Sequence, residues 1–181
     1  MKPSQHDISA ALIKWISNQK VQDWRAVTFL YPRLSGRSSW ERVIKQTMRE
    51  LNNRFYRGAR KRKNLHTGAK SLCRFLVMGG DRRSGTAYHV HGLIDGLGAD
   101  DNYFSKLLNS IWKKNIKRFL RKKAKSEFVE SEALVWHEKL KGSCDPYVKY
   151  MLRHEGNSCG TGIDKVLIAP TYLAGECPES L

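Results

Sequence analysis

The chain has 181 residues, of which 40% are hydrophobic and 10% aromatic, a composition that excludes a disordered chain and fits one folded domain. Its 33 lysines and arginines against 17 aspartates and glutamates give a formal net charge of +16, so a polyanion, nucleic acid above all, is the expected partner rather than a merely basic surface. No apolar run is long enough to span a membrane and residues 1–10 are too polar for a signal peptide, so we expect a cytoplasmic protein with no membrane partner.

The first elements along the chain are predicted to be a helix, a strand and a second helix. Residues 8–18 repeat apolar side chains at helical spacing. Residues 25–31 are β-branched and aromatic and stop before Pro32, which predicts a short buried strand. Ser39 is the expected N-cap of a helix that continues to Phe55 and leads into a basic loop.

The next elements are predicted to be a hairpin and a long helix. Two strands, 72–78 and 87–94, enclose a turn, 79–85, that is rich in glycine and charge. Apolar residues recur at helical spacing over 104–120, and the opposite face of this helix carries a row of lysines and arginines as far as Lys123.

The last third of the chain predicts a strand over 133–136, a short helix that starts at Asp145-Pro146, and a final strand over 166–169. Strands that alternate with helices around a central hairpin indicate an α+β fold. We therefore expect a single domain over residues 1–181, in which an antiparallel sheet of about five strands is flanked by helices in a ferredoxin-like arrangement. Its core would span 25–169 and be followed by a tail, 170–181.

A pair of histidines in the second hairpin strand is the sharpest local signal. Residues two apart in a strand face the same side, so His89 and His91 present two imidazoles that can hold one divalent metal ion. A carboxylate would complete an open site, and Asp81 across the hairpin is the nearest candidate. Histidines on a strand are as often structural, and both interpretations remain open on this pattern alone.

The predicted helix from Asp145 carries a second group of reactive side chains. Tyr147, Tyr150 and Arg153 recur at a spacing of three and therefore share a face, and Lys149 precedes the second tyrosine. A phenol has a pKa of about 10, and a nearby cation favours its ionised, nucleophilic form. The alternative is a helix whose tyrosines pack on the sheet while its cations are solvated.

The two signals together resemble the HUH endonucleases, in particular the rolling-circle replication initiators of plasmids and small phages. The family's first motif is similar to Val27-Thr28-Phe29-Leu30-Tyr31-Pro32, the second to His89-Val90-His91, and the third to Lys149-Tyr150-Met151-Leu152-Arg153. The order and approximate spacing of the motifs agree from about residue 25 to residue 168.

Three positions depart from the family pattern. Arg153 stands where a lysine is usual, and Pro146 takes the place of a first tyrosine in two-tyrosine members. The third metal ligand is commonly glutamate, whereas this hairpin offers Asp81. The resemblance therefore implies a single nucleophile, Tyr150, with Tyr147 as the reserve.

The resemblance implies a nickase of single-stranded or hairpin DNA at a replication origin, in which Tyr150 forms a 5′-phosphotyrosine and leaves a free 3′-hydroxyl. The implied cofactor is Mg²⁺ or Mn²⁺ on His89, His91 and Asp81, and Lys149 would assist the tyrosine. The basic helix face that ends at Lys123 would help to follow the strand. The other implied DNA contacts are Arg60, Lys61, Arg62, Lys63, Arg82, Arg83 and Arg153.

Other functions remain open. The sequence has no P-loop, so an initiator of this size would depend on a host helicase and DNA polymerase. A single-tyrosine transposase or relaxase would use the same strand chemistry. A basic nucleic-acid-binding protein without catalysis would bind DNA in a salt-sensitive way and form no covalent product.

Overall fold

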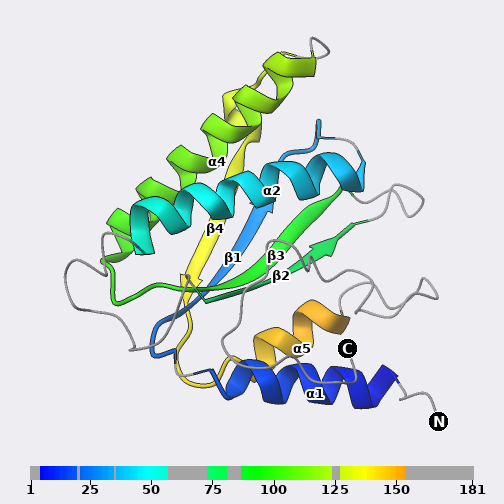
Figure 1. Ribbon diagram of the computed structural model, residues 1–181, viewed down its shortest axis with the longest axis vertical. Coiled ribbons are helices and arrows are strands. Elements are labelled where there is room, and N and C mark those ends of the chain that lie inside the picture. The colour runs from blue at the N-terminus through cyan, green and yellow to red at the C-terminus, as the bar shows by residue number, and fades with distance from the viewer. Residues whose placement is uncertain are drawn as a thin grey trace.

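A computed structural model describes residues 5–19, 21–34, 36–56, 73–80, 87–123 and 127–153. Within these ranges a four-stranded antiparallel sheet is flanked by four α-helices (Figure 1). The elements in chain order are α1 (Gln5–Ser17), β1 (Trp24–Leu30), α2 (Arg37–Leu51), a π-helical turn η1 (Asn52–Tyr56), β2 (Arg74–Gly79), β3 (His89–Asp95), α4 (Asp101–Lys123), a 3₁₀ turn η3 (Glu130–Glu132), β4 (Leu134–Lys139) and α5 (Asp145–Arg153).

The sheet has the strand order β2-β3-β1-β4, and every neighbouring pair is antiparallel. From β1 onward the chain therefore runs strand, helix, two hairpin strands, helix and strand, which is the split β-α-β arrangement of ferredoxin-like domains. This confirms the α+β class and the antiparallel sheet that the sequence predicts.

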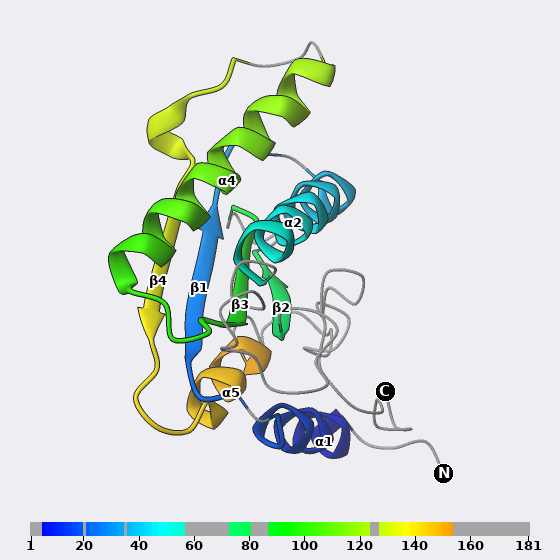
Figure 2. The same cartoon turned by 60° about the vertical axis from the view of Figure 1, so that its left-hand side comes forward.

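Each face of the sheet packs against its own helices, because side chains alternate between the two faces along every strand. One face, with Val27, Phe29 and Val90, forms the larger core against α2 and α4. The other face, with Phe75 and Leu93, forms a smaller core against α1 and α5. In Figures 1 and 2 the two helix pairs lie at opposite sides of the strands.

A buried arginine joins β1 to the start of α4. Arg25 is 1% exposed, and its Nε donates to Oδ1 of Asp23 at 3.1 Å. Its Nη2 donates to the carbonyl of Ala99 at 2.6 Å, and its Nη1 pairs with Asp101 at the start of α4. The guanidinium also lies 5.2 Å from the ring centre of Phe104. A buried charge with this many partners fixes the position of the helix on the strand.

As far as residue 153, the predicted elements agree with the structure except at their ends and at one cap. Ser39 is wrong as the N-cap of the second helix, because α2 begins at Arg37 after Gly36 and Ser39 is buried within it. Gly36 adopts φ +80° and makes no side-chain cap bond, so the turn geometry rather than a hydroxyl starts the helix.

Two further predictions meet the limits of the described ranges. The predicted strand over 166–169, which would be the fifth, lies outside them. In the portions that the structure describes, no helix combines the length and apolar character needed to cross a membrane.

Candidate functional site

The two predicted metal-binding histidines lie side by side on β3, on the sheet face that carries α5. The ring centroids of His89 and His91 are 4.6 Å apart and the rings are nearly perpendicular. His91 is 7% exposed, whereas His89 is half-buried. The strand period of two therefore brings the two imidazoles together as the sequence predicts.

Hydrogen bonds orient both rings. Nδ1 of His89 lies 3.0 Å from the carbonyl oxygen of Ala87, which can only accept, so Nδ1 carries the proton and the lone pair of the neutral ring is on Nε2. Nδ1 of His91 lies 3.0 Å from the hydroxyl oxygen of Thr28, its register partner on β1. When that Nδ1 donates, His91 also carries its lone pair on Nε2, the nitrogen that a metal ion would use.

Gly79 gives His89 its place over the neighbouring strand. The two residues are register partners between β2 and β3. A β-carbon at position 79 would overlap the imidazole of His89 at Nε2. Any larger residue at this position would therefore displace the ring.

Helix α5 brings two tyrosines to the histidine pair. The ring of Tyr150 lies 5.4 Å from that of His91, and the rings of Tyr147 and Tyr150 are 5.9 Å apart. Val148 and Met151 of α5 are buried in the smaller core, against which Tyr147 also packs, and they hold the helix on the sheet. The predicted shared face of the tyrosines is therefore present and points at the histidines.

The two tyrosines differ in their surroundings. The hydroxyl of Tyr147 donates to the carbonyl of Val27 at 3.2 Å, and the side chain is half-buried. Burial raises the pKa of the Tyr147 phenol, the negative charges of Tyr150 and Glu138 add to that rise, and a hydrogen bond with Thr28 opposes it. Tyr150 is 42% exposed, so its side chain reaches the surface of the protein beside the histidines.

A third metal ligand is not found among the described residues, which contain no group of three histidines, cysteines, aspartates or glutamates that could hold an ion. On β2 the residues beside the histidine pair are Val77 and Gly79, neither of which has a carboxylate. Asp81, the predicted third ligand, lies outside the described ranges. The described residues thus fit two nitrogen ligands of a metal site.

The other predicted site residues are the catalytic Lys149 and seven DNA-contacting residues. Lys149 is exposed on α5, one position before Tyr150. Arg153 ends the same helix, and its side chain is outside the described part of the structure. The others also lie outside it: Arg60, Lys61, Arg62, Lys63, Arg82 and Arg83.

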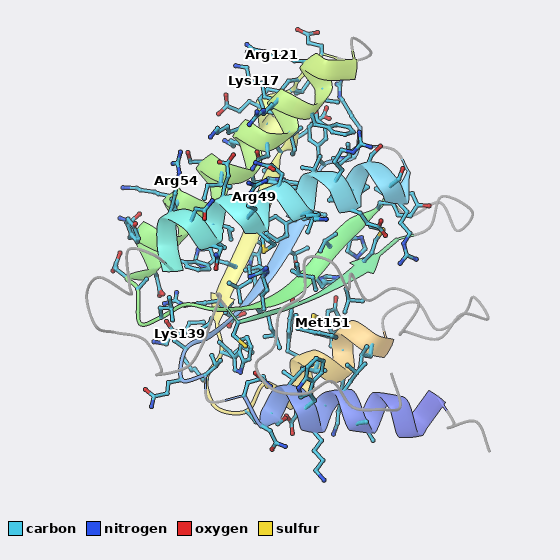
Figure 3. The ribbon with its side chains drawn as sticks, in the orientation of Figure 1. Arg49, Arg54, Lys117, Arg121, Lys139 and Met151 are labelled. Atoms are coloured by element: carbon cyan, nitrogen blue, oxygen red, sulfur yellow. The ribbon has the colours of Figure 1, made fainter. Side chains whose placement is uncertain are left out.

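The basic face of the long helix lies across the sheet from the histidines, because α4 packs on the opposite face. Figure 3 shows Lys117 and Arg121 on α4, with Arg49 and Arg54 on the neighbouring α2 and η1. A strand that contacts both this surface and His91 would have to pass around an edge of the sheet.

The sequence prediction assigned no contact at the site to three residues that the structure places there. Thr28 was recognised only as part of the first motif, and the structure places its hydroxyl on His91. The other two residues are Gly79 and the exposed Trp136, which is the register partner of Thr28 on β4. Their positions at the site depend on strand pairing, which local sequence does not encode.

Comparisons with protein-family models, with curated proteins and with solved structures found no match.

Proposed function

We propose that the protein is a nickase of single-stranded DNA that transfers the 5′ end of the cut strand to Tyr150, in the manner of a rolling-circle replication initiator. The observation that carries this proposal is the position of an exposed tyrosine ring 5.4 Å from the ring of His91, which itself lies 4.6 Å from that of His89. A nucleophile beside two metal-binding side chains is the minimum that phosphoryl transfer to a tyrosine requires.

The chemistry exchanges one phosphodiester bond for another. The phenolic oxygen of Tyr150 attacks the phosphorus atom, the bond to the 3′ oxygen breaks, the phenol loses its proton and the leaving oxygen gains one. Because the new bond is itself a phosphodiester, the reverse attack by a 3′-hydroxyl rejoins the strand without ATP. Lys149, exposed one position before Tyr150, would offset the charge of the phosphate.

The histidines prepare the site for the phosphate. A bound Mg²⁺ or Mn²⁺ would polarise a non-bridging phosphate oxygen. His89 and His91 would hold it through Nε2, with Ala87 and Thr28 fixing the rings at Nδ1. Asp81 remains the proposed third ligand.

Tyr150 is preferred to Tyr147 for two physical reasons. The Tyr147 hydroxyl donates its proton to the carbonyl of Val27. The pKa of Tyr147 is also raised, chiefly by burial, so its nucleophilic form is disfavoured. We propose that Tyr147 packs against the sheet and supports the ring of Tyr150.

Covalent capture on single-stranded DNA tests the proposal. The protein is incubated with a mixed pool of single-stranded oligonucleotides and Mn²⁺, denatured, and separated on a gel. We expect an adduct that needs metal, that Tyr150→Phe and His89→Ala abolish, and that Tyr147→Phe retains.

His137→Gln is the matched control, because His137 lies on β4 with its ring 5.5 Å from that of Phe104, on the other face of the sheet. It should leave the adduct intact. Tight binding of the oligonucleotides without any adduct would instead favour a non-catalytic nucleic-acid-binding protein.

A transposase or relaxase would give the same adduct on a different DNA, and a replication initiator would additionally need a host helicase and polymerase.

A further inference from the structure

Strand β4 exposes two large apolar side chains beside the candidate site. Leu134 is 52% exposed and Trp136 is 49% exposed. The other four tryptophans of the chain are buried or half-buried. An indole ring that is exposed on a regular strand leaves a large apolar surface in contact with water. Exposed apolar surface of this kind indicates a contact for a ligand.

The register places this tryptophan in line with the histidines. Trp136 pairs with Thr28, and Thr28 pairs with His91. Directly paired residues face the same side of a sheet, so the three side chains form one row across β4, β1 and β3. With strands spaced about 4.8 Å apart, Trp136 lies on the order of 10 Å from His91. Leu134 belongs to the next row, which Leu30 and His89 complete.

Among the described residues, the helices on this face contact mainly the other strands. Helix α5 packs chiefly against α1 and β2, and Tyr147 reaches β1 through the carbonyl of Val27. The other face of β4 is covered, since Val135 packs against the core under α4 and His137 against Phe104. The two faces of one edge strand thus differ: one is packed and the other presents Trp136 next to the site.

The charge of the chain indicates what binds there. A protein with a net charge of +16 attracts a polyanion, and Lys141 and Lys149 are exposed on the loop and helix that follow β4. The surface area of two apolar side chains is far smaller than the roughly 1,000 Å² that a specific protein interface needs. An exposed aromatic ring on a strongly basic protein is instead suited to stack on an unpaired base of a single strand.

We propose that Trp136, with Leu134 beside it, is a stacking platform for an unpaired DNA base that neighbours the phosphate held at the histidine pair. The inference rests on the proposed function for the identity of the strand as DNA. Stacking on Trp136 would set which phosphate reaches Tyr150, because Trp136 and His91 lie in one row across the sheet. It also selects single strands, since a duplex hides the faces of its bases.

Fluorescence titration tests the platform apart from cleavage. The Tyr150→Phe protein, in EDTA, is titrated with a short single-stranded oligothymidylate. We expect tryptophan emission to be quenched as the bases stack, and Trp136→Ala to raise Kd about tenfold, within the range measured for base stacking on aromatic side chains. Trp136→Phe, which keeps an aromatic face, should retain most of the affinity.

Tyr103→Ala is the matched control, because Tyr103 is 48% exposed but lies on α4. It should leave Kd unchanged. An unchanged Kd in Trp136→Ala, equal binding of the duplex form, or a change of oligomeric state in Trp136→Ala without loss of DNA binding would each overturn the platform.

The failures of the two proposals are distinguishable. If the wild-type protein forms an adduct but DNA binding does not depend on Trp136, the nickase proposal is supported and the platform proposal is contradicted. Trp136-dependent binding without any adduct keeps the platform and removes the nickase.

Discussion

Thr28 is the residue on which the orientation of the candidate site depends most. Its hydroxyl lies 3.0 Å from Nδ1 of His91, its register partner on β3. A polar partner of this kind fixes the tautomer and the direction of a metal-binding imidazole. Thr28 thus links the first motif of the sequence to the second.

Thr28→Val should weaken metal-dependent activity without loss of the fold, because valine keeps the shape and the β-branched stem of threonine while it removes the hydrogen bond. We expect the Mn²⁺ concentration for half-maximal adduct formation to rise roughly 10- to 100-fold. Metal titration of the adduct assay measures this. Thr47→Val, on a buried threonine of α2 across the sheet, is the control, and an equal shift in both variants would contradict the assignment.

The buried Arg25 network is the feature that fixes β1 to α4 at the scale of elements. Arg25→Met would remove the main partner of Asp23, which is 5% exposed. Of the cations that the structure describes, Lys139 at 3.3 Å would then be the one left beside this carboxylate. We expect the free energy of unfolding to fall by about 3 kcal/mol. Urea denaturation measures it.

Arg33→Met provides the comparison for Arg25. Arg33 pairs with Glu132 at 2.7 Å, but its side chain is 45% exposed, so solvent screens the pair and stability should hardly change. Similar losses of stability in the two variants would show that burial does not set the strength of the Arg25 network.

Local sequence predicts the elements because each one has a regular period. The strand period of two places His89 and His91 on one face of β3, and the helical period places Tyr147 and Tyr150 on one face of α5. The error at Ser39 has a local cause, since Gly36 and its positive φ begin the helix three residues earlier than a hydroxyl cap would.

Strand pairing and helix placement are what the sequence does not encode locally. The meeting of Thr28 with His91, and of Trp136 with Thr28, follows from the register of three strands. The difference between Tyr147 and Tyr150 follows from the position of α5 on the sheet, in which the Tyr147 side chain is half-buried and bonded to β1 whereas the Tyr150 side chain is exposed. Both are properties of packing between distant segments.

The whole molecule separates two kinds of surface. One sheet face, with α5, carries the histidines, Tyr150 and Trp136. The opposite side carries the cations of α2 and α4, three of which form ion pairs: Arg37 with Glu41, Lys113 with Glu130 and Lys114 with Glu50. The proposed chemistry and stacking therefore belong to the first face, and the second contributes to the general attraction of a polyanion.

The most direct test of the central claim is to locate the covalent bond. The wild-type protein is reacted with single-stranded oligonucleotides and Mn²⁺, digested with protease and nuclease, and sequenced by tandem mass spectrometry. We predict a residual nucleotide attached through its 5′ phosphate to the phenol of Tyr150. Attachment to Tyr147 or to any other residue, or no attachment under conditions in which the DNA is bound, would contradict the account.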